Sequence, residues 1–177
     1  LKGFMQDYPN VDLSLSFMGS ESAYQNVKRR NVELAFTTMD EDIPEEFGQH
    51  RLWEDEMVCV CGPTYSLAQQ SQVSLEDLIH HMAILPEDST ITFQLVAKAF
   101  SDAGLALKSP MPTNYLETIK MMVSVGMGWS LLPSTMMDDS LVQLPITSLT
   151  IHRSLGVIFL EGRTLSNAAN AFLDLMS

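Results

Sequence analysis

Residues 113–133 read TNYLETIKMMVSVGMGWSLLP, a pattern typical of a helix that stops at a glycine pair and continues into a short apolar strand. Asn114 is a favourable residue for capping the helix, and Glu117, three residues later, would complete a capping box. Gly126 and Gly128 end the helix, because glycine tolerates left-handed or crowded backbone. The apolar side chains recur at the helical period, at Leu116, Ile119, Met122 and Val123. The stretch therefore predicts a helix, a glycine turn and a buried strand that a proline closes.

The composition indicates a folded domain that does not bind DNA by itself. The chain has 177 residues, of which 46% are hydrophobic and 18% charged, enough for one large core or two small lobes. Ten basic residues against 22 acidic ones give a net charge of -12, which opposes binding to a phosphate backbone. The one basic run, residues 28–30, is predicted to be the solvated end of a surface helix.

Three features favour the cytoplasm. No apolar run approaches the roughly 20 residues needed to span a bilayer, and the N-terminus lacks a basic-then-apolar leader. Cys59 and Cys61 lie two apart in an apolar run, a spacing that fits disulfide geometry badly, so both are predicted to be buried free thiols. Free thiols are typical of a reducing compartment.

The first third of the chain alternates between predicted helices and strands. Apolar residues at the helical period predict a helix over residues 1–8, which Pro9 ends. Residues 11–17 alternate between apolar and polar, the pattern of a strand with one buried face. Ser20 is expected to cap a helix that runs to about Arg30, and residues 32–36 alternate again. This order predicts parallel strands joined by right-handed crossovers.

A second series of elements follows a strand over residues 53–61 and the break at Gly62-Pro63. The predicted elements are a helix opened by Ser74, a strand over 82–85, a helix from Ser89-Thr90 to about Ala103, a short edge strand over 108–113, the stretch quoted above, a strand over 155–160 and a closing helix capped by Ser166. The last strand and helix are most simply assigned to the first series.

Several of these segments resemble the effector-binding domain of LysR-type transcriptional regulators, and the likeness covers nearly the whole chain. The similar motifs are the helix–Gly-x-Gly–strand–Pro element, Tyr8-Pro9 with the alternating residues after it, Gly19-Ser20 with Val32-Glu33-Leu34-Ala35, residues 52–58, residues 73–78 and residues 165–173. Glu33 stands where the family usually has Asp. The family's winged helix-turn-helix, and the first strand of the domain with the loop after it, are expected to be missing from this chain.

The resemblance implies an α/β fold of two Rossmann-like lobes joined by a two-stranded hinge, which is the type II periplasmic-binding-protein-like fold. Residues 1–62 plus 149–177 would form lobe I, and residues 63–148 lobe II. A small-molecule effector would bind between the lobes. The domain would form a homodimer, or a tetramer at full length, and would reach DNA only through the missing N-terminal domain, with no membrane partner.

Helix starts at the ends of strands are the expected effector contacts, because their free N–H groups and partial positive charge suit anions. The candidate effector-binding residues are Ser20, Thr37, Thr38, Pro86, Ser89, Thr90, Asn114, Gly126 and Gly128. Ser20 and Asn114 would equally serve as caps, and the threonines could simply end a strand. Some relatives carry a basic group where Thr37 and Thr38 stand, so hydroxyls there favour a neutral, weakly charged or partly apolar effector.

No catalytic, metal or cofactor site is predicted. The chain has no Gly-x-Ser-x-Gly elbow, P-loop or His-Glu-x-x-His motif. His80 and His81 are adjacent and would point about 100° apart on a helix, too far to share a metal. The acidic cluster within residues 40–46 lacks the ligand spacing of a calcium loop and predicts a solvated loop. The alternative functions are a periplasmic solute-binding protein with the same fold, and an enzyme on this fold.

Overall fold

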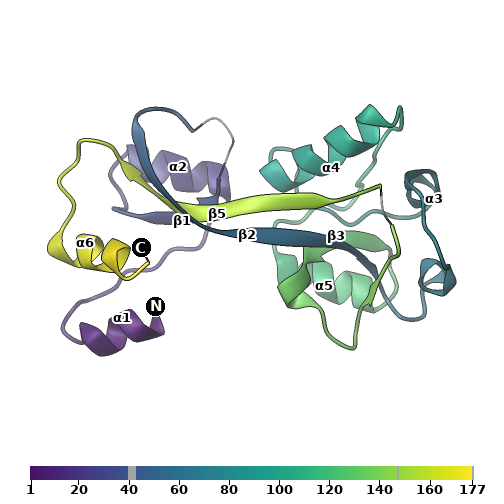
Figure 1. Ribbon diagram of the computed structural model, residues 1–177, viewed down its shortest axis with the longest axis horizontal. Coiled ribbons are helices and arrows are strands. Elements are labelled where there is room, and N and C mark those ends of the chain that lie inside the picture. The colour runs from purple at the N-terminus through teal and green to yellow at the C-terminus, as the bar shows by residue number, and fades with distance from the viewer. Residues whose placement is uncertain (40–42, 147, 177) are drawn as a thin grey trace. The chain divides into compact units, whose positions relative to one another are not determined.

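The computed structural model describes residues 1–39, 43–146 and 148–176, and it is a mixed α/β structure (Figure 1). The acidic residues 40–42 lie outside these ranges. The helices are α1 (Lys2–Asp7), α2 (Ser20–Lys28), α3 (Leu75–Ile79), α4 (Ile91–Asp102), α5 (Leu116–Ser124) and α6 (Asn167–Asp174), with 3-10 turns η1 (Ser66–Gln69) and η2 (Ser134–Met136). The strands are β1 (Ala35–Thr38), β2 (Phe47–Cys61), β3 (Trp129–Pro133), β4 (Val142–Gln143) and β5 (Ile151–Leu160).

The chain divides into two compact units. Unit 1 comprises residues 1–53 and 154–177, and unit 2 comprises residues 54–153. Strands β2 and β5 each continue from one unit into the other, as expected for a two-stranded connection. The hydrogen-bonded strand order is β1-β5-β2-β3, and β4 also pairs with β2. The boundaries expected from the sequence, at residues 62/63 and 148/149, remain a prediction.

Unit 1 packs helices on both faces of the antiparallel pair formed by β1 and β5. Helix α2 covers one face, where Val27 meets a cluster that includes Phe47 and Ile158. On the other face, Phe36 of β1 and Phe4 of α1 both contact the ring of Phe172 in α6 edge-on. Alternation along β1 therefore directs successive side chains to the two helical layers.

Unit 2 has the same three-layer arrangement. Along β2, the side chains of Met57, Cys59 and Cys61 face a core shared with α3 and α4, whereas Val58 and Val60 face a second core shared with α5. Strand β3 pairs antiparallel with β2, with Cys59 opposite Leu131. Figure 1 shows α4 and α5 on opposite sides of these strands. Burial on both faces explains why residues 57–61 are apolar without interruption.

Several elements confirm the sequence-based predictions. The Ser74 hydroxyl accepts from the N–H of Asp77, whose carboxylate accepts from the N–H of Ser74, forming a complete capping box. Ser166 caps α6 by accepting from Ala169. The quoted stretch forms α5 and β3 as expected, separated by Gly126 at φ +83°.

Two predicted strands are wrong. Residues 11–17 are not a strand, because a strand needs a neighbouring ladder and no strand of the described ranges pairs with them. Leu15 and Phe17 are instead 58% and 95% exposed. Residues 108–113 also form no strand, since Pro110 and Pro112 lack the N–H groups that a ladder requires.

The parallel pairing expected in the first third of the chain is not found among the described residues. The ladders of β1 with β5, and of β3 and β4 with β2, are antiparallel. The predicted strand 82–85 is reduced to one parallel bridge between Ala83 and Trp129. In unit 1 the parallel crossover fails because its first strand, residues 11–17, does not form. Among the described helices, none combines the length and apolarity needed to cross a bilayer.

Candidate functional site

The start of α4 brings four predicted site residues of unit 2 together around Glu87. Thr90 is the N-cap of α4: its hydroxyl accepts from the N–H of Phe93 at 3.2 Å and donates to the carbonyl of Glu87 at 2.7 Å. The amide oxygen of Asn114 accepts from the N–H of Glu87 at 2.9 Å. Pro86 is buried just before this turn, and Ser89 is exposed within it. The turn over residues 87–90 is therefore tied to the segment that precedes α5.

The predicted capping role of Asn114 is wrong. Tyr115 is the N-cap residue of α5, and no side chain caps this helix. The Asn114 side chain is engaged by the backbone of Glu87, 27 residues earlier in the chain, so a non-local hydrogen bond replaces the local one that the sequence suggested. A contact between Asn114 and an effector remains a prediction.

The two glycines lie at the other end of α5. Nine residues of helix, about 13 Å, separate them from Asn114. A Cβ on Gly128 would lie 2.2 Å from the carbonyl oxygen of Met82, so this glycine allows two backbone segments of unit 2 to touch. Gly126 provides the left-handed turn after the helix. The structure thus gives both glycines a packing or turn function, and it does not bring them to the Glu87 turn.

In unit 1, Ser20 and the two threonines lie on neighbouring elements, α2 and β1. Ser20 is the first residue of α2 rather than its cap: the N-cap is Gly19, which provides no side-chain hydrogen bond. Thr37 and Thr38, at the end of β1, are 7% and 9% exposed. The Thr37 hydroxyl donates to the carbonyl of Thr38 at 3.3 Å. Their effector contacts also remain a prediction.

A buried ion pair in unit 2 was not predicted from the sequence. The Arg153 guanidinium on β5 donates to the carboxylate of Asp55 on β2 from Nε at 2.8 Å and from Nη2 at 2.6 Å. Its Nη1 lies 3.4 Å from the hydroxyl of Thr92, in the first turn of α4. A signal for Asp55 was present, because it falls on the same strand face as Met57 and Cys59. No local pattern indicated Arg153 or Thr92.

The contacts of Trp129, His80 and His81 are structural. The Trp129 side chain is fully buried, donates from Nε1 to the carbonyl of Leu78 at 3.0 Å and stacks on Phe100, so it is a core residue. His80 ends α3, and His81 lies 3.2 Å from the hydroxyl of Tyr65. Within the described ranges, no group of His, Cys, Asp and Glu side chains is arranged to hold a metal ion.

The two cysteines are free and buried. Burial raises the pKa of the Cys59 thiol far above its usual range, with a further contribution from the neighbouring Cys61. Burial likewise raises the pKa of Cys61 to about 11. Both side chains therefore remain neutral thiols at physiological pH, as packing groups rather than nucleophiles or metal ligands.

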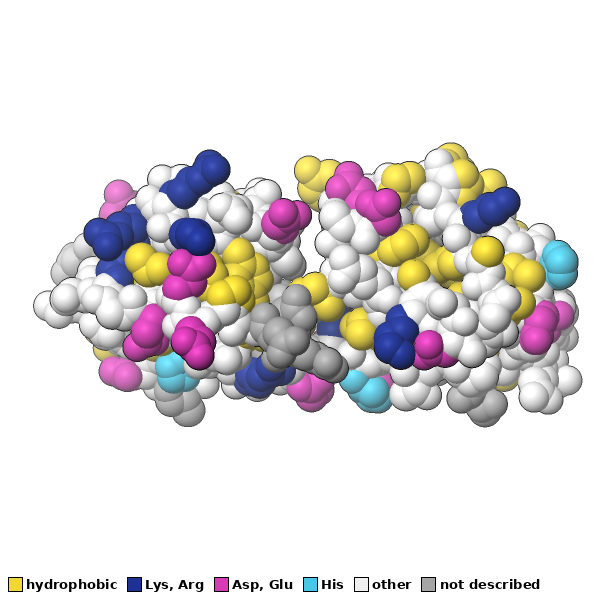
Figure 2. Space-filling model, turned by 90° about the horizontal axis from the view of Figure 1, so that it is seen from above, with side chains coloured by type: hydrophobic (Ala, Val, Ile, Leu, Met, Phe, Trp, Pro, Cys, Tyr) yellow, Lys and Arg dark blue, Asp and Glu magenta, His cyan; other side chains and the backbone are white. Residues whose placement is uncertain are grey.

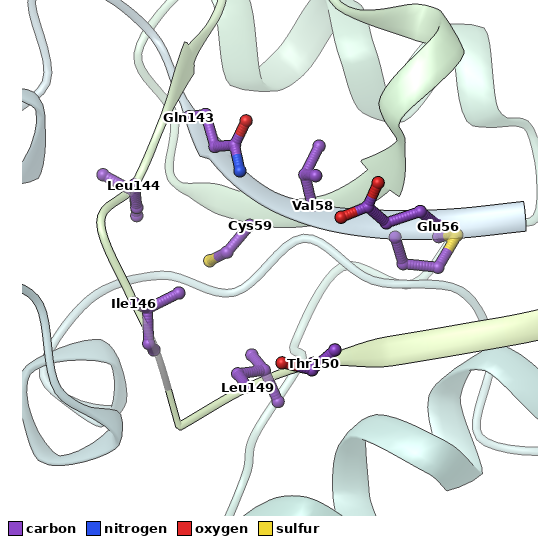
Figure 3. Close-up of a pocket in the computed structure, with 9 residues that line it drawn as sticks. Glu56, Val58, Cys59, Gln143, Leu144, Ile146, Leu149 and Thr150 are labelled. Carbon is purple, nitrogen blue, oxygen red and sulfur yellow. The ribbon is translucent and has the colours of Figure 1, made fainter.

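A small pocket lies within unit 2, where the chain after β4 bends away from β2 (Figure 3). It is lined by Glu56, Met57, Val58, Cys59, Gln143, Leu144, Ile146, Leu149 and Thr150. Its volume is about 90 Å³. Ligand pockets usually exceed about 300 Å³, so this pocket is too small for a metabolite.

The chain is similar to known regulators along its whole length. Residues 1–177 match the model of the LysR substrate binding domain. The transcriptional dual regulator GltC of Bacillus subtilis is 25% identical over 181 residues, covering 98% of this chain and 59% of the relative. The uncharacterized HTH-type transcriptional regulator YeiE of Escherichia coli is 30% identical and is also covered over 59% of its length. The chain thus spans less than two thirds of these relatives, which are regulators and not solute-binding proteins.

A solved structure agrees on the fold. The CcmR regulatory domain of Synechocystis PCC6803 in complex with 2-PG superposes with a TM-score of 0.84 at 23% identity, over 99% of this chain and 86% of that domain. This confirms the periplasmic-binding-protein-like α/β fold. Together with the match over the whole chain, it establishes that the protein belongs to the LysR substrate binding domain family.

Proposed function

We propose that this chain is the effector-sensing domain of a bacterial LysR-type transcriptional regulator. It binds a small-molecule effector and passes the signal to a DNA-binding part of the protein outside these 177 residues. The observation that carries this proposal is the match of residues 1–177 to a family of ligand-binding regulatory domains, which are not enzymes. A ligand can act in this way only through different affinities for two conformations of the domain.

The effector contacts proposed in unit 2 are the groups at the start of α4. Thr90 and Ser89 lie at the start of the helix, the end that carries a partial positive charge, and Asn114 holds the preceding turn in place. In unit 1 we propose contacts from Ser20 and from the hydroxyls of Thr37 and Thr38. Hydroxyl and N–H groups suit an organic molecule with several oxygens. Two solved domains of this fold have small-molecule ligands: CcmR was solved with 2-PG, and QuiR with shikimate.

DNA contact through a separate part of the protein is consistent with the charge of this chain. The net charge of -12 repels a phosphate backbone. Figure 2 shows Lys and Arg side chains interspersed with carboxylates on the visible face of each unit. Lys28, within the single basic run, is paired with Glu46 at 2.8 Å. We further propose a cytoplasmic homodimer, as the family resemblance implies; sedimentation of the purified chain tests the dimer.

Removal of single hydroxyls tests the proposed contacts. Ser20→Ala should weaken effector binding without unfolding the domain, because Ser20 makes no capping hydrogen bond. Ser166→Ala is the matched control: it removes the cap of α6, which is none of the proposed effector contacts, and should lower stability while leaving affinity unchanged. Affinities would be measured by calorimetry with a ligand found in a metabolite panel. Equal affinity of Ser20→Ala and the unmodified chain would exclude Ser20 from the site.

A further inference from the structure

The cluster of Thr92, Arg153 and Asp55 joins three elements of unit 2 at one guanidinium. Arg153 lies on β5, Asp55 on β2 and Thr92 in α4, only two residues after the cap Thr90. The side chains of Arg153 and Asp55 are 11% and 9% exposed, and Thr92 is 5% exposed. The cluster is therefore largely shielded from water, where charged hydrogen bonds are strong and directional.

The cluster also lies where β2 and β5 leave unit 2. Asp55 is the second residue of unit 2 on β2, and Arg153 is its last residue on β5. The next residue on β5, Ser154, already belongs to unit 1, where its carbonyl accepts from the N–H of Met39 at 2.8 Å. The contact between Arg153 and Asp55 therefore joins the two strands at the point where they continue into unit 1.

We propose that Arg153 is a positioning residue that couples the first turn of α4 to β2 and β5. The proposal rests on the proposed function, because α4 begins at the suggested effector contact Thr90. An effector bound there would order the first turn of α4. The Thr92 hydroxyl would then fix the guanidinium through Nη1, while Nε and Nη2 hold Asp55. The ordering of α4 would thus affect β2 and β5 together.

Planar geometry makes arginine suitable for this coupling. Its guanidinium presents donors in a fixed fork, so movement of the Nη1 side is transmitted to the Nε and Nη2 side without a soft torsion between them. A structural ion pair would need only the bonds to Asp55. The contact of Arg153 with the Thr92 hydroxyl is not needed for such an ion pair, so an experiment should remove that hydroxyl.

A hydrogen-exchange experiment without any ligand tests the coupling. Thr90→Ala would loosen the start of α4 by removing its cap. When Thr90→Ala is the only substitution, the rate of amide hydrogen exchange in segments 54–58 and 151–155 should rise about fivefold relative to the rate in β3. In a Thr92→Val background the same change at Thr90 should leave these segments unchanged. Thr92→Ser keeps the hydroxyl and should restore the response.

Two controls separate coupling from general destabilisation. Ser166→Ala removes a cap of the same type in α6 and should not alter exchange in segments 54–58 and 151–155 relative to β3. Thermal unfolding of each variant verifies that it is folded. An equal response to Thr90→Ala with and without the Thr92 hydroxyl would overturn the proposal, and so would no response at all. Failure of effector binding would appear only in the calorimetry described above, so the two failures are distinguishable.

Discussion

Arg153 and Asp55 form a two-pronged contact in which Nε and Nη2 of the guanidinium converge on the same carboxylate oxygen, at 2.8 and 2.6 Å. The pair joins β5 to β2, 98 residues apart in the sequence. Because both side chains are buried, their desolvation offsets much of the attraction between them. Loss of one partner is strongly destabilising, because it leaves the other charge buried without a counter-charge.

Asp55→Ala should therefore destabilise unit 2 strongly, by about 3 kcal/mol in the free energy of unfolding measured with urea. The matched control is Asp102→Ala, which removes the exposed pair between Lys98 and Asp102 in α4. An exposed pair of this kind contributes about 0.5 kcal/mol or less. Similar losses for the two variants would contradict the buried character of the pair formed by Asp55 and Arg153.

Gly128→Ala should be among the most damaging small substitutions in the chain. The added Cβ would lie 2.2 Å from the backbone oxygen of Met82, an overlap that only a backbone shift can relieve. We expect a loss of about 3 kcal/mol in the free energy of unfolding. Gly3→Ala is the control, because it adds the same methyl group within α1 where nothing lies within 4 Å, and it should be neutral or slightly stabilising.

The cysteine thiols should be unreactive in the folded domain. Burial raises the pKa of Cys61 to about 11 and raises that of Cys59 further, so almost no thiolate exists at pH 8. A chromogenic disulfide reagent should label neither thiol in the native domain and both after unfolding in denaturant. Rapid labelling of the native protein would show that residues 57–61 are less buried than the structure indicates.

Glu33 should make stability depend on pH. The N–H of Ser166, at 2.8 Å, and its hydroxyl, at 2.9 Å, hold the pKa of Glu33 below its ordinary value of 4.5, with help from the charge of Arg163. Because the folded-state pKa is lower, the contribution is complete above pH 4.5 and is lost as the pH falls below it.

Glu33→Gln should remove this dependence. At pH 7 we expect a loss of about 1 kcal/mol, comparable to that of a helix cap. At a pH below the folded-state pKa of Glu33, the variant and the unmodified chain should be equally stable. Thermal unfolding over a pH series makes this comparison, and a stability difference that stays constant as the pH falls would contradict the assigned cause.

Local patterns predicted those parts of the fold that local interactions decide. The start of α3 at Ser74, the cap of α6 and the change from α5 through Gly126 to β3 each depend on residues within one or two turns. Residues 11–17 show the limit of such patterns. Alternation shows that a segment could be a strand with one buried face, but the ladder must come from a neighbour, and none of the described strands provides it.

The candidate site was predictable only in part for the same reason. Thr90 was identified because a cap has a local signature. The engagement of Asn114 by Glu87, and of Arg153 by Asp55 and Thr92, joins residues 27, 98 and 61 positions apart, and no sequence window contains both partners. Buried polar groups find their partners in tertiary structure, so a sequence shows at most an anomaly, such as an aspartate on the core face of a strand.

Binding of a small-molecule effector by this chain would be measured by calorimetric titration of the purified domain with 2-PG, shikimate and a panel of organic acids, amino acids, aromatic compounds and purines. We expect saturable binding of at least one compound without chemical turnover. That compound should also raise the unfolding midpoint. At a concentration 100 times its dissociation constant, it should increase the free energy of unfolding by about 2.7 kcal/mol. No saturable binding by any compound in the panel, or conversion of the bound compound to a product, would contradict the proposed effector-sensing function.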